Sequence, residues 1–187
     1  PLEETMQALV DIVRSGKALY VGISNYPLHT LQFVFSYLNK HDVPCLIYQG
    51  KYNIFHRQPE TEGILEACKE AGVGFTAFSP LAQGLLTDRY LNGIPADSRM
   101  ARNFFLKRDV LTDEMLQRIS DLDEVATDRG QTLSAMALSW LLQNSAVTSA
   151  IIGASSSKQL KANIKAVENI NFTESELQRI DAIANML

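Results

Sequence analysis

The chain has 187 residues, 46% of them hydrophobic, which is enough to bury a core, and a single domain spanning residues 1–187 is expected. Its 17 basic and 21 acidic residues form no long block of one sign and give a net charge of −4, which argues against a nucleic-acid partner. No apolar run approaches the roughly 18 residues of a membrane span, and the acidic start PLEETM is unlike a signal peptide, so a cytoplasmic location is expected.

Helical and apolar strand patterns alternate along the chain, and no Gly-x-Gly-x-x-Gly motif accompanies them. In order, the expected elements are helix 2–15, strand 18–23, helix 27–39, strand 43–49, helix 60–71, strand 73–78, helices 113–129 and 132–143, strand 147–153, helix 157–168, and a last helix opened by a Thr173–Glu176 capping box. Because the four strands are apolar throughout, parallel strands covered by helices are predicted. This repetition supports either a doubly wound sheet or a (β/α)8 barrel.

Polar residues follow each predicted strand. The ends carry Ser24-Asn25, Gln49, Phe78-Ser79-Pro80 and Gly153-Ala154-Ser155. In both architectures ligands bind at the carboxyl ends of parallel strands. One polar end alone is usually a turn or a helix cap, and capping is an even alternative for Ser24-Asn25. The four ends together predict a binding site at the rim of the sheet, where the Gln49 amide can pair with a ligand amide.

The residues at these ends also resemble a known family. The stretches VGISNY (21–26), YQGKYNIFHR (48–57), FTAFSPLAQGLLTDRY (75–90) and IIGASSSKQL (151–160) are similar, in order and spacing, to the second half of the aldo-keto reductase superfamily. Within it they resemble bacterial glyceraldehyde 3-phosphate reductases and potassium-channel β-subunits most. The resemblance implies an α/β fold that is the C-terminal half of a (β/α)8 TIM barrel, with four parallel strands and flanking helices. It also implies an oxidoreductase that binds NADPH and reduces aldehydes or ketones by hydride transfer.

The resemblance assigns cofactor roles to several residues. Ser24, Asn25 and Gln49 match residues that hydrogen-bond the nicotinamide carboxamide, a group that needs both donors and acceptors. Phe78 matches a ring that stacks on the nicotinamide, although a core ring capping the barrel is an alternative. The pyrophosphate-binding segment is matched by Ser79, Pro80, Leu81 and Gln83, with Gly84 allowing close approach of the backbone.

An anion site is predicted independently at GASSSK, residues 153–158, because the start of a helix favours negative charge. An ordinary serine-capped helix is the alternative. By resemblance, Gly153, Ala154 and Ser155 would hold the 2′-phosphate of NADPH, with Gln159 and Asn163 turned toward the adenine. Relatives often have Glu where this chain has Ala162.

The long loop from Ser79 to about Thr112 carries a basic cluster: Arg89, Arg99, Arg102, Lys107 and Arg108. The cluster suits a flap over a phosphorylated cofactor or substrate, and equally a solvated or subunit-facing surface. Related sequences have Gly-Lys at the Asp88-Arg89 position, and Asp88 would repel a pyrophosphate.

No catalytic residue is assigned within the chain. The resemblance places the family's Asp-Tyr-Lys-His set in the first half of the barrel, and the start at Pro1 without Met suggests an internal fragment. A small carbonyl compound is the implied substrate. A half-barrel leaves unpaired strand edges and an uncovered apolar face, which favours association with further copies of the chain.

The cysteines and histidines suggest no other chemistry. Cys45 and Cys68 lack CxxC spacing and are expected to be reduced core thiols, and no metal site is expected. Besides the reductase, two functions stay open: an NADPH-binding regulatory subunit like the channel β-subunits, and a truncated product with a structural or assembly role.

Overall fold

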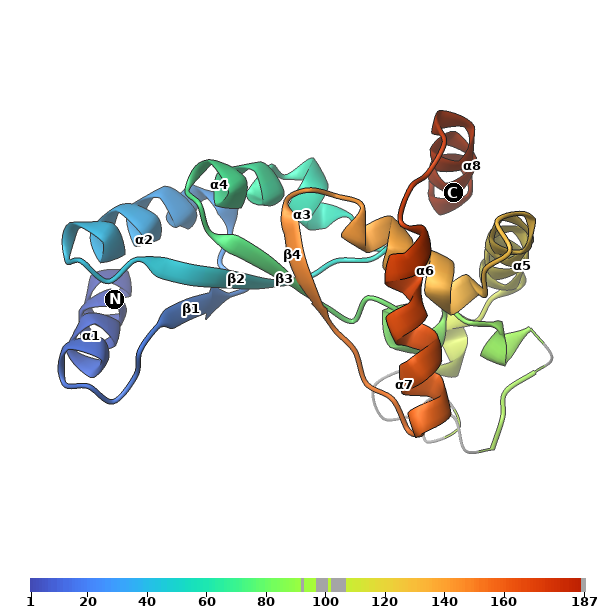
Figure 1. Ribbon diagram of the computed structural model, residues 1–187, viewed down its shortest axis with the longest axis horizontal. Coiled ribbons are helices and arrows are strands. Elements are labelled where there is room, and N and C mark those ends of the chain that lie inside the picture. The colour runs from blue at the N-terminus through green and yellow to red at the C-terminus, as the bar shows by residue number, and fades with distance from the viewer. Residues whose placement is uncertain (92, 97–100, 102–106, 186–187) are drawn as a thin grey trace. The chain divides into compact units, whose positions relative to one another are not determined.

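The computed structural model describes residues 1–91, 93–96, 101 and 107–185 (Figure 1). The chain forms two compact units. The first comprises Pro1–Tyr52, Arg57–Phe78 and Ser145–Ala150, and the second comprises Asn53–His56, Ser79–Asn144 and Ile151–Leu187. Whether residues 1–187 act as one domain stays a prediction.

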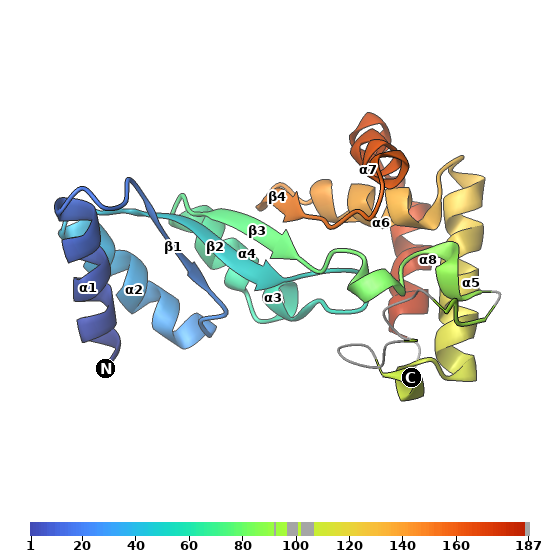
Figure 2. The ribbon, with the colours of Figure 1, turned by 90° about the horizontal axis from the view of Figure 1, so that it is seen from below.

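The first unit is built on a parallel sheet. The strands follow one another in the order β1 (Val21–Ser24), β2 (Cys45–Lys51), β3 (Gly74–Phe78) and β4 (Val147–Ile151). The helices of this unit are α1 (Leu2–Arg14), α2 (Leu28–Lys40), α3 (Gln58–Thr61) and α4 (Ile64–Glu70). Helix α2 contacts β2, α4 contacts β3, and α1 lies beside α2 (Figures 1 and 2). The expectation of an α/β fold with four parallel strands and flanking helices is confirmed.

The helices cover one face of this sheet. A buried row runs across it from Ile23 through Tyr48 to Phe75, and the Tyr48 and Phe75 rings stack at 5.6 Å. The other face is open, since Leu46 and Ile47 are 49% and 36% exposed. This is the uncovered apolar face expected of a half-barrel, since closing the barrel would turn that face inward.

The second unit is helical. It contains α5 (Asp113–Asp128), α6 (Leu133–Leu142), α7 (Ser157–Ile164) and α8 (Glu174–Ala184), with 3-10 turns at Ala82–Gly84, Asp88–Tyr90, Arg108–Val110 and Lys165–Asn169. Helix α5 contacts both α6 and α8 and runs alongside α8 (Figure 2). The predicted capping box is present, with Thr173 and Glu176 each accepting a hydrogen bond from the other's backbone N–H.

Several predicted boundaries are wrong. Strand 18–23 begins only at Val21, and Leu19 and Tyr20 are exposed. Helix 60–71 is instead two short helices, because Gly63 has a left-handed φ of 80° between them. Strand 43–49 runs from Cys45 to Lys51, so Gln49 does not end it, and strand 147–153 ends at Ile151. Helix 157–168 ends at Ile164 and continues as a 3-10 turn.

Within the described residues, every helix is too short or too polar to cross a bilayer.

Candidate functional site

The first unit brings three of the predicted residues together, where β1 ends beside β2. Ser24 of β1 lies opposite Gln49 of β2 in the parallel register. The backbone N–H of Asn25 donates to the Gln49 carbonyl at 3.1 Å, and the Asn25 side-chain NH₂ donates to Ser24 Oγ at 3.1 Å. Ser24 and Asn25 are exposed and Gln49 is half-buried, so a hydroxyl and two amides are accessible at one place.

Asn25 is held in an uncommon backbone conformation. Its φ of 59° lies in the left-handed region, which Asn tolerates better than most side chains but which still costs about 1 kcal/mol. Such residues concentrate at binding sites, where the surrounding structure over-determines them. Here the hydrogen bond to the Gln49 carbonyl fixes the turn that follows β1.

Alternation along the strands places further side chains on the same open face of the sheet. Gln49 lies opposite Thr76 of β3, and Lys51 lies opposite Phe78. Phe78 is half-buried. Thr76 is buried, at 8% exposed, whereas Lys51 is half-buried. Lys51 was not predicted as a site residue; the signal for it is its place two residues after Gln49 along the same strand.

The second unit contains the predicted pyrophosphate segment as a tight turn, residues 79–84. The Ala82 N–H donates to the Ser79 carbonyl at 3.0 Å, and the Gly84 N–H donates to the Leu81 carbonyl at 2.8 Å. Gln83 lies within this turn, and Pro80 is buried. The predicted residues of this segment are therefore neighbours in space as well as in sequence.

The start of α7 is capped from within. Ser156 Oγ accepts from the Gln159 N–H at 3.2 Å, and Gln159 Oε1 accepts from the N–H and hydroxyl of Ser155 at 2.9 and 2.8 Å. Gly153 and Ala154 precede this cap and are exposed. Gln159 is exposed, but Asn163, one turn later, is only 9% exposed.

Among the residues of the predicted basic cluster, Arg89 is half-buried after Thr87, whose Oγ1 accepts from the Arg89 N–H at 3.2 Å. Lys107 and Arg108 are exposed, whereas Arg99 and Arg102 lie outside the described residues. Asp88 adds negative charge beside α5: burial raises the pKa of Asp123, and the nearby Asp88 carboxylate raises it further. These carboxylates oppose a phosphate near Arg89.

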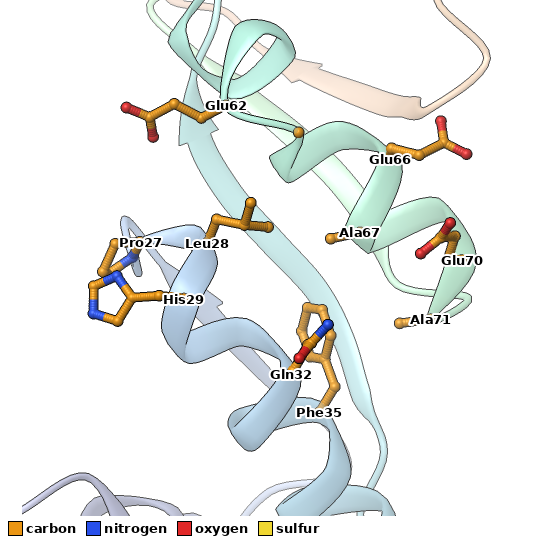
Figure 3. Close-up of a pocket in the computed structure, with 11 residues that line it drawn as sticks. Pro27, Leu28, His29, Gln32, Phe35, Glu62, Glu66, Ala67, Glu70 and Ala71 are labelled. Carbon is orange, nitrogen blue, oxygen red and sulfur yellow. The ribbon is translucent and has the colours of Figure 1, made fainter.

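A groove of about 1000 Å³ lies elsewhere in the first unit, between α2 and α4 (Figure 3). Leu28 and Phe35 extend from α2 toward α4, and Glu62, Glu66 and Glu70 also line the groove (Figure 3). Three carboxylates disfavour a phosphorylated ligand. None of the predicted site residues lines this groove.

The cysteines do not supply a nucleophile. Burial raises the pKa of the Cys45 thiol to about 11 and of the Cys68 thiol to about 12, so both are protonated at neutral pH. In the described part of the chain, no three His, Cys, Asp or Glu side chains are grouped as a metal ion would require.

Comparison with known proteins identifies the family. The model of the Aldo/keto reductase family matches residues 1–185. The chain is 47% identical over 185 residues to L-glyceraldehyde 3-phosphate reductase of Escherichia coli K12, covering 97% of this chain and 54% of that protein. It is 34% identical over 188 residues to a probable voltage-gated potassium channel subunit beta of Oryza sativa subsp. japonica, covering 98% of this chain and 57% of that protein.

A solved structure agrees with this result. The thermostable aldo-keto reductase Tm1743, in complex with the inhibitor epalrestat, superposes with a TM-score of 0.69 at 30% identity, over 98% of this chain and 55% of that one. The chain thus spans about half the length of the relatives that it matches. The family model, the relatives and the parallel sheet agree: the chain belongs to the aldo/keto reductase family.

Proposed function

We propose that the chain supplies the cofactor-binding residues of an NADPH-dependent oxidoreductase that reduces an aldehyde or a ketone to the alcohol. Family membership supports oxidoreduction in general terms. NADPH, when bound, supplies a hydride to the carbonyl carbon, and a proton completes the alcohol at the carbonyl oxygen. We place the proton donor outside this chain, because the resemblance assigns the family's Asp-Tyr-Lys-His set to the other half of the barrel.

The observation that supports this proposal most directly is the cluster of Ser24, Asn25 and Gln49. A carboxamide has two donor hydrogens and an acceptor oxygen, and a hydroxyl with two amides can complement all of them. Hydrogen bonds from the end of β1 and from Gln49 within β2 would fix the orientation of the nicotinamide. Phe78, in the same unit, would present its ring for stacking.

The second unit carries groups that suit the phosphates. In the proposed function the turn formed by Ser79, Pro80, Leu81 and Gln83 binds the pyrophosphate. The start of α7, with Gly153, Ala154 and Ser155, binds the 2′-phosphate, because the helix dipole favours an anion at the start of a helix. Gln159 and Asn163 would contact the adenosine, and Arg89 would be a lesser contact because Asp88 lies next to it. The two buried free thiols fit the cytoplasmic location that we propose.

A titration of the chain with NADPH and NADH, followed by cofactor fluorescence, tests the proposal. Gln49→Leu should lower the NADPH affinity about tenfold, since a lost hydrogen bond to a buried partner costs about 1.4 kcal/mol. Gln32→Leu is the matched control, because Gln32 is an exposed amide of α2 that lies in the groove and away from the strand ends. Equal binding of NADPH by the Gln49 variant and the unchanged chain, or no preference for NADPH over NADH, would contradict the proposal.

A second candidate is an NADPH-binding regulatory subunit in which turnover is secondary. It is favoured by the 34% identity to a protein described as a probable voltage-gated potassium channel subunit beta. Tight NADPH binding combined with an absence of carbonyl reduction in the complete protein would support this candidate. Binding of the cofactor by this chain alone would count against the third alternative, a purely structural product.

A further inference from the structure

A buried amide supports the turn of residues 79–84. Asn53 is only 1% exposed and belongs to the second unit. Its Nδ2 donates to the Ser79 carbonyl at 2.9 Å, across 26 residues of sequence, and its Oδ1 accepts from the Phe55 N–H at 3.0 Å. Each end of the amide therefore holds a different segment of backbone.

The segment that carries Asn53 is itself held firmly. The Asn53 and His56 backbones exchange two hydrogen bonds, of 3.2 and 3.0 Å. The Arg118 guanidinium lies over the Phe55 ring at 4.9 Å and also donates to the carbonyls of Ile183 and Ala184 at the end of α8. Asn53 thus projects from a turn that is hydrogen-bonded and packed on both sides of it, so its hydrogen bond can restrain the strained segment that it reaches.

The turn of residues 79–84 is strained. Ser79, Ala82 and Gln83 have φ values of 53°, 47° and 59°, and each non-glycine residue in this region costs about 1–2 kcal/mol. Such a conformation persists only where the surrounding structure over-determines it. The Ser79 carbonyl accepts two hydrogen bonds: one from the Ala82 N–H, within the turn, and one from the Asn53 side chain, outside it.

We propose that Asn53 is a positioning residue for cofactor binding: it holds the Ser79 carbonyl so that the backbone of residues 79–84 keeps the conformation offered to the pyrophosphate of a dinucleotide. Asn53 acts through this turn and does not itself touch the cofactor. The proposal rests on the proposed function for its ligand and on the Asn53–Ser79 hydrogen bond for its mechanism.

Asn53→Asp is the most selective test. It keeps the size of the side chain and the acceptor for the Phe55 N–H, but it sets a carboxylate oxygen against the Ser79 carbonyl oxygen. Asn53→Ala removes both hydrogen bonds. Ser139→Ala is the matched control, since Ser139 is a fully buried polar residue of the same unit that donates to Ala135 and Ala166, outside the turn.

Two ligands and one backbone measurement separate positioning from general destabilisation. The ligands are NADPH and 2′,5′-ADP, which lacks a pyrophosphate, and amide hydrogen exchange of residues 79–86 reports the turn. Asn53→Asp should weaken NADPH binding about tenfold or more, leave 2′,5′-ADP binding within about twofold, and speed exchange in the turn. Ser139→Ala should lower the thermal stability without changing NADPH affinity or exchange in the turn.

Each contrary result has a distinct meaning. If the unchanged chain binds NADPH and the Asn53→Asp variant binds it equally well, the positioning role is overturned while the proposed function stands. An equal loss of affinity for both ligands would also overturn it, because the effect would then not be specific to the pyrophosphate. If the unchanged chain binds neither ligand, the proposed function fails for this chain, and the cofactor role of Asn53 fails with it; hydrogen exchange still decides whether Asn53 holds the turn.

Discussion

Gly50, which follows Gln49 in β2, is required by packing. A Cβ at this position would lie 2.8 and 2.9 Å from ring atoms of Phe75, on the face of the sheet that the helices cover. Real side chains do not approach so closely. Gln49 and Gly50 therefore point to opposite faces of the sheet. Gln49 points to the open face, and Gly50 leaves room for the Phe75 ring on the face that the helices cover.

Gly50→Ala should lower the free energy of unfolding by about 1–3 kcal/mol, as overpacking of a core does. Urea unfolding of the variant would measure this loss. The double variant Gly50→Ala with Phe75→Leu should lose less than the sum of the two single variants, because the smaller side chain relieves the contact. Additive losses would show that the Phe75 ring is not the obstacle.

The positions of single residues in the fold were predictable where they depend on the strand pattern. The position of Ser24 at the end of β1 follows from an apolar run that ends in a polar residue, whereas Gln49 lies two residues before the end of β2; the register places these two residues opposite each other. The hydrogen bond from Asn53 to Ser79 was not predictable in this way, because the two residues lie 26 positions apart and the contact depends on how two loops meet. Nor could the break at Gly63 be read from sequence, because an isolated glycine is also tolerated inside a helix.

At the scale of elements, Arg129 joins the end of α5 to the start of α8. Its side chain is 3% exposed and pairs with Glu176 at 2.7 Å. It also donates to the Asn171 carbonyl at 3.1 Å and lies 3.6 Å from the centre of the Phe172 ring. One guanidinium thus fixes the segment between the 3-10 turn that follows α7 and the capping box of α8.

Arg129→Ala should destabilise the chain by about 2–3 kcal/mol, since Glu176, whose side chain is 25% exposed, loses its ion pair but keeps its hydrogen bonds from Thr173, and the Asn171 carbonyl loses its donor. Arg129→Lys should recover only part of this loss, because an ammonium cannot reproduce the stacked, forked guanidinium. Arg179→Ala is the control: Arg179 forms an exposed pair with Asp128, and its loss should cost no more than about 1 kcal/mol. Equal effects of the two alanine variants in thermal unfolding would contradict this assignment.

The same cluster predicts a dependence on pH. Burial acts to raise the pKa of Glu176, but hydrogen bonds from Thr173 and the charge and hydrogen bond of Arg129 outweigh it, so the pKa is lowered from 4.5. A carboxyl group with a lowered pKa stabilises the fold above its unfolded pKa, and this contribution is lost as the pH falls through the folded value. Glu176→Gln should therefore be less stable than the unchanged chain at pH 7.

The difference in stability between the Glu176→Gln variant and the unchanged chain should shrink progressively as the pH falls below 4.5. It should vanish below the folded pKa of Glu176. Thermal unfolding at a series of pH values measures this difference. A constant gap from neutral to acid pH would show that the loss comes from the shape or hydrogen bonding of the glutamine and not from the lost charge.

At the scale of the whole molecule, the helices and strands alternate as predicted, but the burial of the strands does not follow from their composition alone. An apolar run such as Leu46-Ile47 has the pattern of a strand covered on both faces, yet in the first unit helices cover only one face. What covers a strand depends on partner elements that a local pattern does not identify. The chain spans about half the length of its relatives, and in a complete barrel further strands would turn this face inward.

The exposed apolar face of the sheet should make the chain associate with itself as its concentration rises. In sedimentation velocity, the sedimentation coefficient of the unchanged chain should then rise with protein concentration. Ile47→Lys should reduce this rise, because a charge on the open face opposes association. Ile12→Lys is the matched control, since Ile12 lies on α1 and is exposed to a similar extent: 40% for Ile12 and 36% for Ile47. Circular dichroism checks that both variants fold. If the two substitutions reduce association equally, general surface hydrophobicity drives it; if the unchanged chain sediments as a monomer at every concentration, the open face of the sheet is not an association surface.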